Sequence, residues 1–230
     1  MKLIAIGDIH GRTTWRTIVN RNKDARIVFL GDYFDPYEDI DPMDMVENFN
    51  AIITLKKERP DDVILLLGNH DMHYIDKDFP QGSRYNEMLA PTITGLFMKN
   101  RNLFQYAYQA GNTIFTHAGI SDSWFNDEFR GNNAPKEGEP TIADQLNNPT
   151  EEQRRAMYHV GLIRGGDRMN GGIFWADMTE TEHHPLRGYH QVAGHTQVPC
   201  LYEREQSADT SITYCDTLGY TCDYFAMDMP

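Results

Sequence analysis

Residue types that ligate metals follow three short apolar runs, at residues 3–6, 27–30 and 63–67. Each run has the length and composition of a buried strand, and each is followed by a glycine that allows a sharp turn. Because the carboxyl ends of parallel strands meet along one edge of an α/β sheet, we expect the side chains after the runs to converge. Carboxylate, imidazole and amide oxygen in one crevice predict a divalent-metal site. The residues concerned are Asp8, His10, Asp32, Asn69 and His70.

Helical periodicity separates these runs. Residues 12–22 place apolar side chains on one helical face, and residues 43–59 repeat them at helical spacing up to Pro60, a normal helix stop. The order of strand, helix, strand, helix, strand is that of βαβ units and a parallel sheet. The chain therefore predicts an α/β fold.

Two more histidines follow strand-like segments in the second half of the chain. Residues 104–108 and 113–115 flank turn residues and predict a β-hairpin that ends at His117. Residues 189–193 form an apolar run that continues into Gly194 and His195. Closing strands are expected at residues 211–215 and 224–227.

Between these segments we expect helices and a loop insertion. Helices are predicted at residues 85–99, where Pro91 interrupts or restarts the pattern, and at residues 151–163. Residues 131–149 are rich in Gly, Pro and Asn and predict a loop with one short helix. No internal repeat is visible, so we predict a single domain over residues 1–230, with a loop or helical insertion around residues 120–170.

Composition excludes several classes of protein. The net charge of −13 opposes an exposed basic groove for nucleic acid, although bound cations can still make a small positive site. The three cysteines, an odd number without a Cys-x-x-Cys pair, predict small core side chains in a reducing compartment. No apolar stretch reaches ~18 residues, so no membrane span is expected. A cleavable signal peptide would remove Asp8 and His10, and we therefore predict a cytoplasmic protein.

Taken together, five blocks resemble the calcineurin-like metallophosphoesterase family. They are Asp8-x-His10, Gly31-Asp32-x-x-Asp35, Gly68-Asn69-His70-Asp71, His117 and Gly194-His195. The forms Gly-Asp-Ile-His-Gly and His-Ala-Gly are similar to its phosphoprotein-phosphatase branch, which includes bacterial Ser/Thr phosphatases and dinucleoside tetraphosphatases. The resemblance implies a four-layer α-β-β-α sandwich with mixed sheets.

The resemblance also implies a role for each matched residue. Asp8 and His10 would bind a first metal, Asp32 would bridge two metals, and Asn69, His117 and His195 would complete the second site. Manganese is expected first, with iron, zinc or a mixed pair as alternatives. A metal pair of this kind can hold a phosphoryl group and a hydroxide for in-line attack. His70 would be the general acid that protonates the leaving oxygen, and Asp35 would orient it.

Two departures from the branch concern substrate binding. The usual Asp-Arg-Gly is replaced by Asp35-Pro36-Tyr37, so the arginine that ordinarily holds a phosphate oxygen is absent. Arg164 is our first substitute, and Arg12, Arg168 and Arg187 are alternatives. Position 197 is Gln, whereas phosphodiesterase-type members have a second His there, which lowers the expectation of a diesterase or nuclease.

These features predict a dinuclear metal-dependent phosphoesterase that acts on a phosphomonoester, either a phosphoprotein or a small phosphate. The first alternative is a phosphodiesterase or a dinucleoside polyphosphate hydrolase. An alternative of another class is a catalytically weak protein-binding scaffold on the same fold. The expected partner is a phosphorylated substrate, without membrane and without nucleic acid, and the oligomeric state stays open.

Overall fold

The computed structural model describes residues 1–131, 138 and 140–229. Its first sheet has the strand order β10-β1-β2-β3-β4. The strands are β1 (Lys2–Ile6), β2 (Arg26–Phe29), β3 (Val63–Leu66), β4 (Phe104–Gln105) and β10 (Phe225–Asp228). β1, β2, β3 and β4 are parallel to one another, and β10 is antiparallel to β1. The three apolar runs of the sequence are therefore adjacent strands, and their ligand-bearing ends lie on one edge of the sheet.

The second sheet has the order β5-β6-β7-β9-β8. Its strands are β5 (Ala107–Ala110), β6 (Thr113–Thr116), β7 (His190–Gln197), β8 (Tyr202–Ser207) and β9 (Thr210–Asp216). The central strands β6, β7 and β9 are parallel, and the edge strands β5 and β8 are antiparallel to their neighbours. Both sheets are thus mixed, as predicted.

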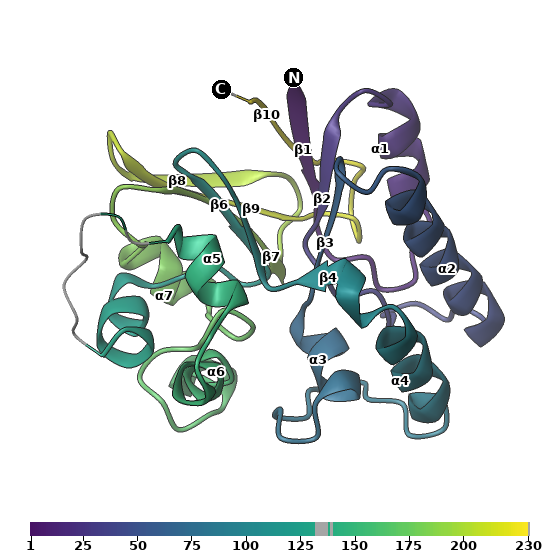
Figure 1. The fold of residues 1–230 in the computed structure, drawn as a ribbon, viewed down its shortest axis with the longest axis horizontal. Coiled ribbons are helices and arrows are strands. Elements are labelled where there is room, and N and C mark those ends of the chain that lie inside the picture. Colours follow the sequence, from purple (N-terminus) through teal and green to yellow (C-terminus); the bar gives the residue numbers. More distant parts are fainter. Residues whose placement is uncertain (132–137, 139, 230) are drawn as a thin grey trace.

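Successive side chains of a strand point to opposite faces of its sheet, so each sheet contributes to two core layers. In β1, Leu3 and Ala5 belong to a core cluster with Phe115 and Val192 of the second sheet. The intervening Ile4 and Ile6 belong to the larger cluster, which includes apolar residues of α1 (Trp15–Arg21), α2 (Pro42–Glu58) and α4 (Ala90–Lys99). Figure 1 shows these helices outside the first sheet, and α5 (Ile142–Asn147), α6 (Glu151–Met157) and α7 (Met178–His183) on the side of the second. The predicted four-layer sandwich is confirmed.

Several predicted elements were wrong in detail. The segment 104–108 is not one strand of a hairpin, because Phe104–Gln105 pairs with β3 and the chain changes sheet at Tyr106. The side chain of Asn147 accepts the backbone N–H groups of Tyr106 and Ala107 at this crossing. The helix predicted at residues 85–99 begins only at Ala90, and Pro91 lies in its first turn, where the missing N–H costs nothing.

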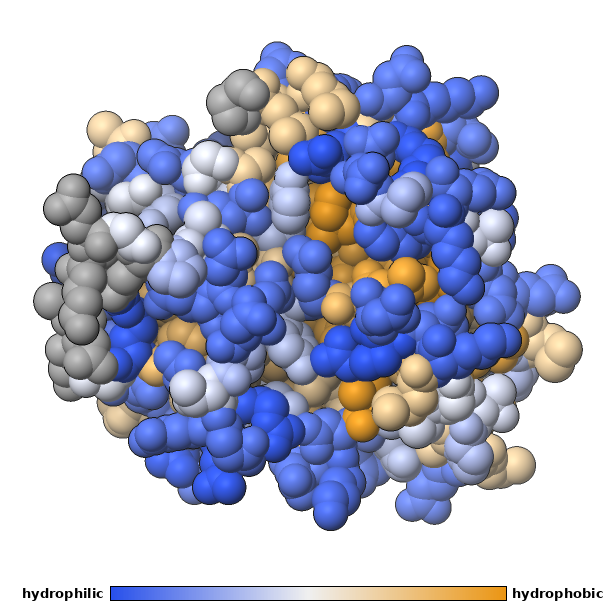
Figure 2. Space-filling model, in the orientation of Figure 1, coloured by the Kyte–Doolittle hydropathy of each residue, from blue (hydrophilic) through white to orange (hydrophobic). Residues whose placement is uncertain are grey.

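The region 120–170 contains a π-helical turn at Trp124–Phe129, α5, α6 and a 3₁₀ turn at Leu162–Arg164. The helix predicted at residues 151–163 ends at Met157. Part of the predicted loop, residues 132–137 and 139, lies outside the described residues. Within the described chain, no helix is both long and apolar enough to cross a bilayer. Figure 2 shows a mainly hydrophilic face, with apolar residues visible mostly near its middle.

An aromatic cluster lies under the loop that follows β2. The ring of Phe49 from α2 is 4.9 Å from that of Phe34, 5.7 Å from that of Tyr33 and 5.1 Å from that of Phe97. Tyr33 and Phe34 stand between Asp32 and Asp35 in the chain, so this packing fixes the loop that carries both carboxylates. Phe49 is only 1% exposed.

We predict that Phe49→Ala lowers the free energy of unfolding by about 3–5 kcal/mol, because it removes a buried ring and leaves a cavity. Denaturant titration of the full chain measures the change. Met43→Ala in the same helix is the control, since Met43 is 67% exposed and a surface change usually stays within about 0.5 kcal/mol. Equal losses in the two variants would contradict the prediction.

Candidate metal centre

Four residues at the candidate site have an unusual backbone conformation. His10, Asp32, Asp35 and His195 have φ angles of +44°, +52°, +59° and +62°. Non-glycine residues rarely adopt left-handed conformations, and such strain concentrates at functional sites. These are four of the residues that the sequence predicted as functional. The turns after β1 and β2, and the irregular end of β7 that contains His195, direct them to one place.

Asp71 ties the loop after β2 to the loop after β3. Its buried carboxylate accepts the backbone N–H groups of Asp32 and Gly68 at 2.8 Å, and that of Tyr33 at 2.9 Å. Asp71 lies in α3 (Asn69–Ile75), a short helix that the sequence analysis did not predict. The helix begins at Asn69, one of the predicted ligands, so its first turn is part of the candidate site.

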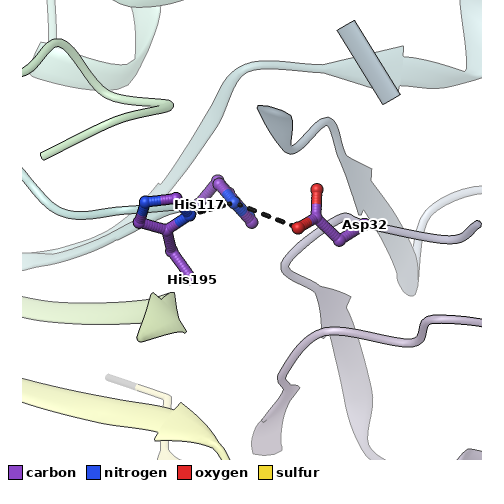
Figure 3. A group of neighbouring side chains, drawn as sticks. All are labelled: Asp32, His117 and His195. Carbon is purple, nitrogen blue, oxygen red and sulfur yellow. Dashed lines mark hydrogen bonds and ion pairs between the residues drawn. The ribbon is translucent and has the colours of Figure 1, made fainter. Parts of the chain in front are cut away.

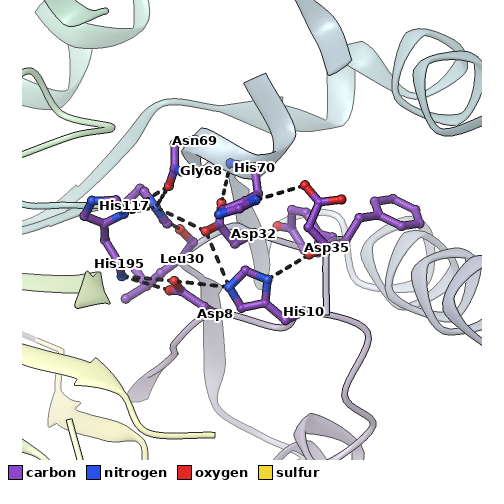
Figure 4. A network of polar contacts seen from close by, with 12 residues as sticks. Asp8, His10, Leu30, Asp32, Asp35, Gly68, Asn69, His70, His117 and His195 are labelled. Atoms are coloured by element: carbon purple, nitrogen blue, oxygen red, sulfur yellow. Dashed lines mark hydrogen bonds and ion pairs between the residues drawn. The ribbon is translucent and has the colours of Figure 1, made fainter. Parts of the chain in front are cut away.

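Asp8, His10 and Asp32 form a first cluster (Figure 4). Nδ1 of His10 is 2.8 Å from the carbonyl oxygen of Phe34, so this nitrogen carries the proton and donates. Nε2 is 3.9 Å from Asp8 Oδ2 and 3.6 Å from Asp32 Oδ2. Burial lowers the pKa of His10 to about 3, and Nε2 therefore presents a lone pair to two carboxylates. A cation fits between these three groups.

Asp32, Asn69, His117 and His195 form a second cluster, part of which is drawn in Figure 3. Nδ1 of His117 is 2.9 Å from the carbonyl oxygen of Leu30 and donates to it. Nε2 of His117 is 2.8 Å from Asn69 Oδ1, 3.1 Å from His195 Nδ1 and 3.5 Å from Asp32 Oδ2. Because burial lowers the pKa of His117 to about 3, acceptor atoms face one another here. Such a donor set suits a divalent cation.

The pKa values of the carboxyl groups shift in the opposite direction to those of the histidines. Burial raises the pKa of both Asp8 and Asp32, and the neighbouring Asp216 raises that of Asp8 further. Asp216 is the last residue of β9, and burial raises its own pKa to about 7. Its Oδ1 has no hydrogen-bond partner within the described residues. The sequence analysis did not place Asp216 at the site.

His70 and Asp35 form a pair beside both clusters. Nδ1 of His70 is 2.9 Å from Asp35 Oδ2, and the His70 ring is 5.2 Å from the His10 ring. The backbone N–H of His70 donates to Asp32 Oδ1 at 2.9 Å, which ties the pair to the shared ligand. Donors around Asp35 outweigh the effect of burial and lower the pKa of its carboxyl group.

Of the four arginines predicted as candidates for phosphate binding, Arg164 and Arg12 lie near the clusters. Nη2 of Arg164 donates to Thr196 at 2.7 Å, and its charge adds to burial in lowering the pKa of His117 and His195. Arg12 is buried, donates to Glu38 at 3.0 Å, and its charge opposes the burial that raises the pKa of Asp8. Arg168 and Arg187 pair instead with the carboxylates of Asp167 and Asp122.

The model of the calcineurin-like phosphoesterase family matches residues 1–199. The chain belongs to this family. Its reaction class is therefore the metal-dependent hydrolysis of phosphate esters, and both clusters have the residue types for holding metal ions. A search among curated proteins gives no match.

Solved structures show the same fold at low sequence identity. A cold-active protein-tyrosine phosphatase of a psychrophilic Shewanella is 16% identical, with a TM-score of 0.61 over 99% of this chain and 75% of that one. A protein serine/threonine phosphatase from Saccharomyces cerevisiae is 15% identical, with a TM-score of 0.52 over 94% of this chain and 66% of that one.

Gly68 has no room for a side chain. A Cβ at this position would collide with Asp32 Oδ1 and lie 2.7 Å from the His117 ring. Gly68→Ala should therefore displace two ligands and weaken Mn²⁺ affinity by about 10-fold or more. Gly95→Ala is the matched control, because a Cβ there meets nothing within 4 Å. Titration calorimetry measures both, and an unchanged affinity in Gly68→Ala would contradict this account of the site.

Metal binding should release protons. Because the pKa of Asp8 and of Asp32 is raised, the metal-free centre keeps protons on these carboxyl groups to a higher pH than free aspartates do, and a cation must displace them. Mn²⁺ affinity should therefore increase as the pH rises. Calorimetry in two buffers with different ionisation enthalpies measures the released protons, and binding without proton release would be inconsistent with these pKa directions.

Proposed function

We propose that this chain hydrolyses a phosphomonoester at a dinuclear metal centre, with His70 as the general acid. One observation carries the proposal: Oδ2 of Asp32 faces both clusters, at 3.6 Å from His10 Nε2 and 3.5 Å from His117 Nε2. A carboxylate shared in this way supports a pair of cations more than two separate sites.

Each cluster would hold one divalent cation, for which we propose manganese, with iron, zinc or a mixed pair as alternatives. Asp8, His10 and Asp32 would hold the first, and Asp32, Asn69, His117 and His195 the second. When bound, such a pair supplies positive charge for phosphoryl oxygens and lowers the pKa of water. Neutral imidazoles add no negative charge, and the two carboxylates of Asp8 and Asp32 offset only part of the positive charge of two cations. A phosphate can therefore approach despite the net charge of −13.

Arg164 would hold a phosphoryl oxygen at the second cluster. Its Nε is 2.7 Å from Asp177 Oδ2 and its Nη2 bonds Thr196, so the guanidinium is fixed in place beside His195. A fixed planar guanidinium suits a phosphate better than a flexible ammonium group does. Arg12 is a weaker candidate, since it is buried and paired with Glu38.

His70 would hold a proton at Nε2 and deliver it to the leaving oxygen. The Nδ1–H donates to Asp35, which leaves Nε2 as the atom available to the substrate. The His70 ring lies 5.2 Å from the His10 ring, and this proximity to the first cluster supports the role. Asp35 positions the ring and does not itself contact the substrate.

The monoester is favoured over the diester by two observations. Gln197 replaces the second histidine of diesterase-type members, and it is exposed at the end of β7. The structures similar in fold include a protein-tyrosine phosphatase and a protein serine/threonine phosphatase, so a phosphoprotein is a candidate substrate. A dinucleoside polyphosphate stays the alternative. The scaffold alternative is opposed by the presence of every expected ligand.

Hydrolysis of aryl mono- and diesters by the Mn²⁺-loaded chain tests the proposal. We expect a higher kcat/KM for the monoester and about two metal ions per chain by elemental analysis. A clear preference for the diester would overturn the choice of substrate class. One metal per chain at saturation would overturn the dinuclear centre.

His70→Asn should keep the metals and lose about 10²–10⁴-fold in kcat on an alkyl phosphate, the usual contribution of a general acid. The loss should be smaller on an ester of an acidic phenol, which leaves without a proton. The control is His183→Asn, an exposed histidine of α7 that should change neither rate. An undiminished kcat on the alkyl ester would remove His70 from this role.

A further inference from the structure

Asp35 receives more polar contacts than its pairing with His70 requires. Its Oδ2 lies 2.9 Å from His70 Nδ1 and 2.8 Å from His73 Nε2, and its Oδ1 accepts the hydroxyl of Tyr74 at 2.6 Å. The carboxylate is only 2% exposed. Neither His73 nor Tyr74 belongs to the two metal clusters or to the mechanism above.

The proton of His73 is placed by a backbone group. The N–H of Gly82 donates to His73 Nδ1 at 3.3 Å, so Nδ1 accepts and the proton lies on Nε2, toward Asp35. Nε2 of His73 lies 2.8 Å from Asp35 Oδ2, but its N–H is not aligned well enough for this contact to count as a hydrogen bond. Asp35, His70 and His73 are close enough together to suggest a third metal site. A neutral His73 with Nδ1 already accepting has no second lone pair for a cation, so we assign it as a donor.

Tyr74 is fixed in the same way from the same segment. Its hydroxyl donates to Asp35 and accepts the backbone N–H of Asn86 at 2.9 Å. The segment 82–86 is also anchored to the residues after Asp35, because Arg84 donates to the carbonyl of Pro36 at 3.2 Å and lies 4.1 Å from the centre of the Tyr37 ring. One surface segment therefore fixes both extra donors.

We propose that His73 and Tyr74 are positioning residues that hold the Asp35 carboxylate in line with His70. This inference rests on the proposed function, in which His70 protonates the leaving oxygen. With both donors present, the plane of the carboxylate is set by contacts on both oxygens, and Oδ2 points at His70 Nδ1. Without them the carboxylate can rotate, and the His70 ring loses the orientation that directs Nε2 to the leaving group.

Leaving-group dependence separates this role from a merely structural one. A residue that only supports the fold would lower every rate alike, whereas a residue that orients the general acid affects mainly leaving groups that need a proton. The series runs from esters of acidic phenols to alkyl phosphates. The variants are Tyr74→Phe, His73→Leu and His73→Gln, because glutamine retains an N–H donor.

Tyr85→Phe is the matched control. The Tyr85 ring packs 4.8 Å from the Tyr74 ring and 5.0 Å from the His73 ring. It makes no hydrogen bond to Asp35 within the described part of the chain, so it loses a hydroxyl in the same packing environment without removing a donor.

With the Mn²⁺-loaded full chain, Tyr74→Phe and His73→Leu should lose about 10-fold in kcat on the alkyl phosphate and less than about 2-fold on the most acidic phenol. KM and metal content should stay near wild type. His73→Gln should recover most of the loss, and Tyr85→Phe should show none. Tyr74→Phe keeps the ring, so it decides the matter should His73→Leu fail to fold.

A uniform loss across the series, the same loss in Tyr85→Phe, or no recovery in His73→Gln would overturn the positioning role. If His70→Asn steepens the leaving-group dependence while Tyr74→Phe and His73→Leu leave it unchanged, this inference alone falls. If the wild type hydrolyses no monoester of the series, the proposed function falls and this inference falls with it.

Discussion

The placement of Asp32 is the constraint on which the centre depends. Its backbone is left-handed, its N–H is bound by Asp71, and its Oδ1 accepts the N–H of His70. These contacts leave Oδ2 facing the imidazoles of His10 and His117. One carboxylate therefore connects the loops after β1, β2, β3 and β6. A small shift of Asp32 would disturb both clusters at once.

This arrangement is costly for the protein without a cation. Buried carboxylates have their pKa raised and buried imidazoles have theirs lowered, so the groups tend toward neutrality rather than pairing as ions. In a core that binds no metal, such a cluster would only lower stability and would be selected against. Bound cations reverse this balance, because they favour the ionised carboxylate and use the lone pairs of the neutral imidazoles.

The rest of the structure holds these groups in place from two directions. The aromatic cluster around Phe49 packs under Tyr33 and Phe34, and so supports the loop from Asp32 to Asp35 from below. The second sheet adds His117 and His195, and the backbone N–H of His195 donates to Asp8 at 3.0 Å. Because both sheets contribute ligands, the packing of one sheet on the other determines the geometry of the centre.

The sequence by itself determined the family, the α/β class and the residues of the two clusters, because each of these residues lies at or just after the end of a strand that local pattern reveals. It missed α3, α7 and β8, which are short or exposed elements without a clear apolar period. Only the tertiary structure decided that residues 104–108 divide between two sheets, since that depends on what each strand finds as a neighbour. The same holds for His73 and Tyr74, which no local motif marks, and for the position of Asp216 beside Asp8. They join the site through contacts between segments far apart in the chain, and those contacts exist only once the two sheets have packed.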